Sequence, residues 1–270
     1  MNKIIVLGTG HATVKKCYNT CFALEKDNEY LLVDAGGGNQ ILSQLDKANI
    51  SLTQIHHLFA THEHTDHILG VVWIVRMIAT LMISQSYQKP FHIYCHQELV
   101  STIQTLCHLT LQKKLTALFD DKHICFHGLE DGQQERILGH TFTFFDILST
   151  KAKQFGFTFI NDNHEKIVFT GDEPYNTECA SYVQDAAWLL HEAFCLFSER
   201  DIHHPYEKHH STVKDAANLA TKLHAKHLIL WHTEETHLKQ RQKLYTQEAK
   251  QSFSGKIDVP NDLDVIPLLS

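Results

Sequence analysis

Short apolar runs alternate with amphipathic stretches along the chain, and this order is typical of a layered α/β protein. In the first half, apolar runs predict strands over residues 4–7, 21–24, 30–34 and 57–60. Between them, residues 40–48 have the spacing of an amphipathic helix. The last of these strands leads directly into a cluster of histidines, and strand ends are where such folds place their chemistry.

The second half repeats this layout. Strands are predicted over residues 141–147, 155–160, 166–170, 187–190 and 227–231. A helix is expected to begin near Ser211, because Ser211 or Thr212 can cap it and Thr212 and Asp215 have the spacing of a capping box. Each half delivers polar residues from strand ends, which predicts a four-layer αβ/βα sandwich with a site along one edge.

Length and composition narrow the class of protein. The 270 residues, 43% of them hydrophobic, can bury a full core, and we expect residues 1–270 to form one domain. The apolar run at the start is too brief for a signal peptide. The longest run, residues 71–83, contains Arg76 and falls short of the roughly 20 residues that span a bilayer. We expect that run to be a buried helix and the protein to have no membrane association.

Cysteine usage and charge add two expectations. The seven cysteines are odd in number and scattered, without C-x-x-C spacing, which indicates reduced thiols in the cytoplasm. The formal net charge of −7 argues against broad attraction to nucleic acid, although it leaves open a local basic rim. Histidine is unusually abundant, with 22 residues, so only spacing can single out the functional ones.

The segment from His62 to His67 has such spacing. His62 and His64 are two residues apart, so on extended backbone both face the same side and can bind one metal ion through their imidazole nitrogens. Asp66 and His67 follow at a predicted turn, where they can be directed at a second ion about 3.5–4 Å from the first. Six residues would thus supply half of each of two metal sites.

This segment resembles the HxHxDH motif of the metallo-β-lactamase superfamily and matches it at every specified position. The resemblance extends through four further segments: Gly8-Thr9-Gly10, Val33-Asp34-Ala35-Gly36, Thr170-Gly171-Asp172 and Leu230-Trp231-His232. It implies two divalent metal ions as cofactors. Zinc is the expected metal, with manganese or iron as alternatives. It also implies that Asp172 bridges both ions and that His232 completes the second site.

Within the superfamily, the chain most resembles ribonuclease Z and related phosphodiesterases. His191-Glu192-Ala193 is similar to that group's HEA(T) element, and His210-Ser211-Thr212 is similar to its HST loop. Both resemblances imply positions near the reacting phosphate. The sequence has no room for the long arm with which ribonuclease Z grips transfer RNA, because only residues 161–165 separate two predicted strands. Related proteins are often dimers, so the resemblance also implies a homodimer.

One expected ligand is absent. The superfamily supplies a third histidine to the first metal from a strand in the middle of the chain, and the matching position here is Leu148. Leucine cannot bind a metal, so the first site would keep His62, His64 and Asp172 and bind its ion more weakly. Asp146 would face the same side of a strand and could replace the ligand directly or through water. Otherwise only the second site is occupied, or the sequence has been altered from an active parent.

The resemblance implies hydrolysis by a metal-bound hydroxide, which forms because coordination lowers the pKa of water to about 7. Asp66 would orient this nucleophile or accept its proton. His191, steadied by Glu192, would protonate the leaving oxygen. The loop at His210 and the metals would offset charge on the other phosphate oxygens.

The substrate is accordingly expected to be a small phosphodiester or a short single-stranded nucleic acid. Two other classes of function stay open. An acyl hydrolase acting on thioesters or lactones uses the same motif on the same fold. A metal-impaired pseudoenzyme or sensor would keep the fold alone. Leu148 favours that last reading, whereas the intact Asp66, Asp172 and His232 oppose it.

Overall fold

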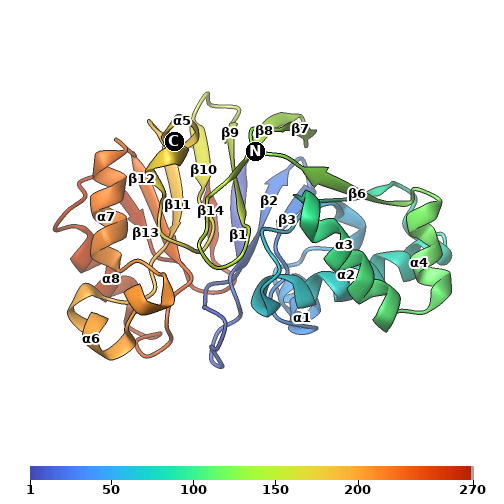
Figure 1. Ribbon diagram of the computed structural model, residues 1–270, viewed down its shortest axis with the longest axis horizontal. Coiled ribbons are helices and arrows are strands. Elements are labelled where there is room, and N and C mark those ends of the chain that lie inside the picture. The colour runs from blue at the N-terminus through green and yellow to red at the C-terminus, as the bar shows by residue number, and fades with distance from the viewer. Residues whose placement is uncertain (269–270) are drawn as a thin grey trace. The chain divides into compact units, whose positions relative to one another are not determined.

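The computed structural model describes residues 1–268, which form two compact units (Figure 1). Unit 1 comprises Met1–Gly8, Tyr18–Glu130 and the segment from Leu263 onward, and unit 2 comprises Thr9–Cys17 and Asp131–Asp262. Each unit contains one mixed seven-stranded sheet with helices packed on it, as the α/β prediction requires. That residues 1–270 form a single domain stays a prediction.

The sheet of unit 1 has the strand order β14-β1-β2-β3-β4-β5-β6. Its strands are β1 (Lys3–Gly8), β2 (Cys21–Lys26), β3 (Glu29–Val33), β4 (Ile55–Phe59), β5 (Phe91–His96), β6 (Ile124–Leu129) and β14 (Val265–Pro267). Pairing is antiparallel from β14 to β3 and parallel from β3 to β6. The four strands predicted for this half are confirmed, and their ends differ from the predicted ones by no more than two residues.

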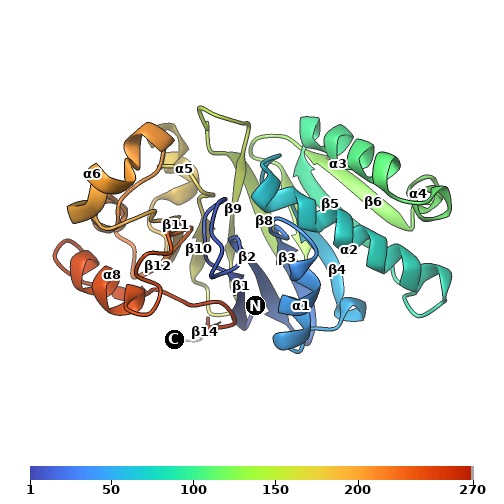
Figure 2. The same cartoon turned by 90° about the horizontal axis from the view of Figure 1, so that it is seen from below.

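Four helices pack on the sheet of unit 1, with α2 beside α1, α3 and α4 (Figure 2). They are α1 (Gln40–Lys47), α2 (Thr65–Ile83), α3 (Gln97–Thr110) and α4 (Lys113–Asp120), and a short 3-10 turn, η1 (Leu52–Gln54), precedes β4. Their apolar faces and the sheet share one core cluster. By length and composition, α2 is the one helix in residues 1–268 that could cross a membrane. In its apolar 18-residue stretch, 56% is buried inside the protein. The predicted buried helix is therefore confirmed, and it begins earlier than the apolar run.

The sheet of unit 2 has the order β13-β12-β11-β10-β9-β8-β7. Its strands are β7 (Gln134–Ile137), β8 (His140–Asp146), β9 (Phe155–Ile160), β10 (Lys166–Phe169), β11 (Trp188–Glu192), β12 (His227–Trp231) and β13 (Lys256–Asp258). Pairing is antiparallel from β7 to β10 and parallel from β10 to β13. Both sheets thus join an antiparallel half to a parallel half.

Helices and short turns connect the parallel strands of unit 2. They are η2 (Thr177–Cys179), α5 (Ala180–Val183), η3 (Phe197–Glu199), α6 (Arg200–His203), η4 (Tyr206–Lys208), α7 (Val213–Lys222) and α8 (Arg241–Ala249). The predicted capping box is confirmed at α7, where Thr212 is the N-cap. The Thr212 hydroxyl accepts from the Asp215 backbone N–H at 3.3 Å, and the Asp215 carboxylate accepts from the Thr212 N–H at 3.0 Å. This cap fixes where the chain leaves the His210 loop and enters the helix.

Candidate metal centre

Polar residues collect at the carboxyl ends of parallel strands in both units. In unit 1, Asp34 follows β3, and the loop after β4 carries His62 and His64. In unit 2, Asp172 lies three residues beyond β10, and His232 follows β12 directly. The carboxyl ends of parallel strands in one sheet lie at the same edge, which is where α/β proteins bind ligands. Each sheet therefore presents ligand-type side chains at its functional edge.

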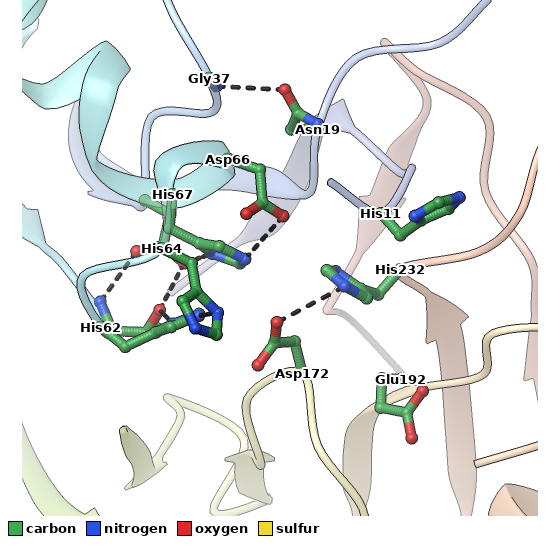
Figure 3. Close-up of polar contacts among 12 residues, drawn as sticks. His11, Asn19, Gly37, His62, His64, Asp66, His67, Asp172, Glu192 and His232 are labelled. Atoms are coloured by element: carbon green, nitrogen blue, oxygen red, sulfur yellow. Dashed lines mark hydrogen bonds and ion pairs between the residues drawn. The ribbon is translucent and has the colours of Figure 1, made fainter. Parts of the chain in front are cut away.

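The HxHxDH segment spans a loop and the start of a helix. His64 is the N-cap of α2 and has extended backbone (φ −62°, ψ 147°), and the helix begins at Thr65. Asp66 and His67 therefore lie in the first helical turn, so the predicted turn at these two residues was wrong. The Nε2 atom of His62 lies 2.8 Å from Nδ1 of His64, a hydrogen-bond distance, so the two imidazoles lie next to each other, as expected (Figure 3).

Asp34 holds the histidines of this segment in orientation. Its carboxylate accepts from the Thr61 backbone N–H and hydroxyl, each at 2.8 Å, and from His67 Nδ1 at 2.7 Å. Since the Thr61 hydroxyl donates to Asp34, it accepts from His62 Nδ1 at 2.9 Å. Complete burial raises the pKa of the Asp34 carboxyl, and these donors oppose the rise. The result is that His62 and His67 both present Nε2 as an acceptor, the tautomer that metal ligation needs.

The donor set of unit 1 fits a divalent ion. His67 Nε2 lies 3.2 Å from Asp66 Oδ2, and both side chains are buried. Once His67 Nδ1 carries the proton, Nε2 and the carboxylate are two acceptors, which repel each other unless a cation or a second proton lies close to both. Imidazole and carboxylate are ligands that zinc and related transition metals accept.

Unit 2 presents a second pair of ligand-type groups, Asp172 and His232. Oδ2 of Asp172 and Nε2 of His232 point toward one another at 3.5 Å (Figure 3). The other carboxylate oxygen, Oδ1, accepts a short hydrogen bond from the buried side-chain amide of Gln154. His232 has left-handed backbone (φ 56°), a conformation that costs free energy in a residue other than glycine and is found disproportionately at functional sites.

The three other predicted catalytic residues also lie in unit 2, but one contact expected among them is absent. His191 Nδ1 lies 2.6 Å from the backbone carbonyl of Glu192, so the Glu192 side chain does not steady it as expected. That carboxylate instead accepts a short hydrogen bond from the Ser211 backbone N–H and lies 3.6 Å from His210 Nδ1. His210 Nδ1 also lies 3.0 Å from the Asp172 carbonyl, so Glu192 organises the His210 loop.

The segment around Leu148 is not a strand. β8 ends at Asp146, whose carboxylate accepts from the Leu148 backbone N–H at 2.8 Å, and Leu148 is left-handed (φ 58°) and 40% exposed. The strand thus does not continue to Leu148, so the argument that Asp146 and Leu148 face the same side of a strand was wrong. Within residues 1–268, Asp146 belongs to none of the groups of side chains that could hold a metal ion.

A family comparison decides the assignment. The model of a protein family described as "Anti-Pycsar protein Apyc1" matches residues 2–254. The chain belongs to this family. It is 26% identical to ribonuclease Z of Thermococcus sibiricus, over 99% of this chain and 97% of that protein. This Apyc1-family chain is thus a metal-dependent hydrolase of the metallo-β-lactamase superfamily that resembles ribonuclease Z, as the sequence predicted.

Solved structures confirm the fold. The metallo-β-lactamase fold protein YhfI from Bacillus subtilis has a TM-score of 0.79 and 18% identity, and the match covers 98% of this chain and 99% of that one. Zinc-bound PqqB from Methylobacterium extorquens has a TM-score of 0.72 and 11% identity, over 98% of this chain and 100% of the other. The predicted metallo-β-lactamase sandwich class is correct.

Two supporting residues escaped the prediction of the site. In the sequence, Asp34 stands out only as part of a strand end that matches the superfamily, and no motif marks Gln154. Their hydrogen bonds link positions that are 27, 33 and 18 residues apart, so no local spacing reveals them. A buried carboxylate directly after a strand, next to a matched histidine motif, was the one available signal for Asp34.

Proposed function

We propose that the chain is a phosphodiesterase that uses two divalent metal ions to hydrolyse a small phosphodiester or a short single-stranded nucleic acid. The observation that carries the proposal is the arrangement of donors inside each unit. In unit 1, Asp34 and Thr61 fix His62 and His67 with Nε2 as an acceptor. In unit 2, Gln154 and the backbone hold the Asp172 and His232 pair at 3.5 Å.

The proposed ligands follow from these donors and from the superfamily motif. His62, His64 and Asp172 would hold the first ion, and Asp66, His67, His232 and the shared Asp172 would hold the second. We propose zinc, with manganese or iron as alternatives, since imidazoles dominate the set. Ions bound there lower the pKa of water and offset negative charge on a phosphate.

The remaining side chains have separate proposed roles. Asp66 would orient the attacking water and take up its proton, as the resemblance to the superfamily implies. His191 would donate a proton to the leaving oxygen. Its Nδ1 is held by a carbonyl, and within the described residues its buried Nε2 has no hydrogen-bond partner. Glu192 would act by positioning the loop of His210, whose imidazole would approach the phosphate oxygens.

The proposed substrate is small because the chain lacks an insertion in unit 2. β9 and β10 are consecutive antiparallel strands joined by residues 161–165, a tight turn in which Asn161 accepts from the backbone N–H groups of Asn163 and Glu165. The alignment with the ribonuclease Z of Thermococcus sibiricus extends over 316 positions, more than this chain has residues, so that protein carries segments absent here. This chain would therefore lack the surface needed to hold a long folded RNA.

Two further parts of the proposal concern the cell and the assembly. We place the protein in the cytoplasm, because no disulfide joins the cysteines and burial raises the pKa of the Cys95 and Cys107 thiols to about 12, which suits inert, reduced side chains. A homodimer is proposed from the resemblance to ribonuclease Z.

A panel of chromogenic esters tests the class of substrate. The protein loaded with zinc or manganese is assayed with bis(p-nitrophenyl) phosphate, p-nitrophenyl butyrate and a thioester. We expect the phosphodiester to have the highest kcat/KM, and Asp66→Asn to lower it by about 10²–10⁴-fold, the range typical of a lost acid or base. Glu63→Gln is the matched control, since Glu63 is an exposed carboxylate inside the same motif. Faster hydrolysis of an acyl ester, or full activity in Asp66→Asn, would contradict the proposal.

A further inference from the structure

Unit 2 contains another group of ligand-type side chains, which the hydrolytic centre does not use. Glu199 ends η3, His203 ends α6, and Glu234 lies in the loop that follows β12. One donor atom from each of the three lies within 4.8 Å of the other two. The group thus joins the segment that leads to the His210 loop with the segment that follows β12.

The distances within this group are those of ligands around a shared ion. His203 Nε2 lies 3.6 Å from Glu199 Oε2 and 4.0 Å from Glu234 Oε2. Both separations are too long for a hydrogen bond. Ligand atoms at about 2.0–2.2 Å from one zinc ion are roughly 3.4 Å apart at tetrahedral angles and farther apart at wider ones. A cation between the three side chains therefore accounts for the spacing better than direct contacts do.

Each carboxylate has one hydrogen-bonded oxygen. In Glu199 the oxygen that lies 3.6 Å from His203 is the other one, whereas in Glu234 the oxygen that lies 4.0 Å from His203 is the bonded one. Glu199 Oε1 accepts from His237 Nε2 at 2.6 Å, and Glu234 Oε2 accepts a short hydrogen bond from the Thr236 backbone N–H. The remaining oxygens, Glu199 Oε2 and Glu234 Oε1, are buried and have no hydrogen-bond partner within residues 1–268. The Glu234 side chain is only 4% exposed. A buried carboxylate oxygen without a donor is costly, and a bound cation removes that cost.

Nearby guanidinium groups do not supply the missing donor. The buried Arg241 side chain donates to Thr233, Thr9, the Pro260 carbonyl and Asn261. Arg200 donates to the Phe197 carbonyl and forms an ion pair with Asp201 at 3.7 Å. In the described part of the chain, neither arginine forms an ion pair with Glu199 or Glu234, and the group near both carboxylates is the His203 imidazole.

A cavity lies next to the group. His237, which bonds Glu199, also lines a cavity of about 820 Å³ together with Glu235 and Arg241. The side chains of His203 and Glu199 are 18% and 20% exposed, so the group is accessible to an ion and to water from solvent. The pattern of two carboxylates and one imidazole suits a divalent transition metal better than calcium or magnesium, which prefer oxygen ligands alone.

We propose that Glu199, His203 and Glu234 form a structural binding site for a divalent transition-metal ion of the zinc class. His237 is a positioning residue, which holds one oxygen of Glu199 so that the other is directed at the ion. The ion fastens η3 and α6 to the loop after β12 and so steadies the segments that flank His210 and His232. This site and the hydrolytic centre share no residues. The proposed structural ion and the proposed phosphodiesterase activity can therefore be tested independently.

Zinc stoichiometry tests the proposal. The background is a chain with His62→Ala, His67→Ala and His232→Ala, which removes ligands of the hydrolytic centre. After dialysis against limiting free zinc, elemental analysis should find one equivalent of zinc per chain. Adding Glu199→Gln and His203→Ala should abolish it. Adding Glu207→Gln and His204→Ala instead should leave it unchanged, because this matched pair lies on the same segment, 3.3 Å apart, but is exposed.

A thermal melt followed by circular dichroism gives a second readout. Zinc should raise the melting temperature of the background and of the Glu207/His204 control, and not that of the Glu199/His203 variant. If the combined variants do not fold, His203→Gln in the otherwise unaltered chain should lower the total zinc content by one equivalent. No zinc in a folded background, or undiminished zinc after the loss of Glu199 and His203, would overturn the proposal.

Discussion

At the scale of single residues, the site depends on buried side chains that hydrogen bonds hold in orientation. The ligands of unit 1 could be predicted because His62, His64, Asp66 and His67 stand within six positions of one another. The part played by Asp34 could not, because its bonds to Thr61 and His67 form only when β3, β4 and α2 pack together. Local spacing reveals ligands that are neighbours in sequence, whereas tertiary packing selects the groups that orient them.

Leu148 provides a prediction at this scale. Histidine adopts the left-handed backbone of position 148 (φ 58°) more readily than leucine does. If this position corresponds to the missing third histidine, Leu148→His should increase the zinc bound at limiting free zinc and raise phosphodiester turnover. Leu109→His, at an exposed leucine of α3, is the control. An unaltered zinc stoichiometry would show that the ligand position was matched to the wrong residue.

A pH prediction concerns His57 in unit 1. Burial, with the neighbouring positive charges of His92 and His56, lowers the pKa of His57 to about 4. The unfolded chain, with an ordinary histidine pKa near 6.5, therefore binds more protons than the folded one between about pH 6.5 and 4. Stability should fall as pH is lowered through this window. Urea unfolding at pH 7 and pH 5 should show a smaller drop in the midpoint for His57→Gln than for the exposed control His224→Gln. Equal drops would contradict the assignment.

At the scale of elements, α2 and the loop after β3 form one support for the ligands. The Ala35 backbone N–H donates to the His67 carbonyl at 3.1 Å, and the Gly70 N–H donates to the Gly36 carbonyl at 2.8 Å. A Cβ atom at Gly70 would lie 1.8 Å from the Ala35 carbonyl oxygen, so the approach of helix and loop requires glycine there. The sequence shows α2 as an apolar run, but neither its start at Thr65 nor this close contact.

Gly70→Ala should therefore displace the first turn of α2. We expect a loss of about 1–3 kcal/mol in the free energy of unfolding, the usual range for an overpacked contact, together with weaker zinc binding because Asp66 and His67 move with the helix. Gly38→Ala is the matched control, since nothing lies within 4 Å of a Cβ atom at that position. Chemical denaturation and a zinc titration measure the two effects. Similar values for both variants would show that the contact between α2 and the loop is unimportant.

At the scale of the whole molecule, the alternation of apolar runs predicted a layered α/β protein, and the HxHxDH motif narrowed this to the metallo-β-lactamase sandwich. Each predicted strand has its counterpart in one of the two sheets, because a run of four or more apolar residues between turn signals has few other stable arrangements. The expectation that Asp146 and Leu148 share one side of a strand failed because the Asp146 carboxylate bonds the backbone N–H two residues on, and the strand ends there. Periodicity does not reveal this local competition. The group of Glu199, His203 and Glu234 also escaped prediction, because it joins separate segments of unit 2.

Removal and return of metal tests the central claim most directly. Protein freed of metal by a chelator should lose its hydrolysis of bis(p-nitrophenyl) phosphate and regain it on addition of zinc or manganese. Asp172→Ala should bind less metal and fail to regain activity, whereas Glu63→Gln, at the exposed carboxylate of the histidine motif, should regain it. Hydrolysis that persists at the same rate once no metal is detectable, or that returns fully in Asp172→Ala, would contradict the account of this chain as a metal-dependent phosphodiesterase.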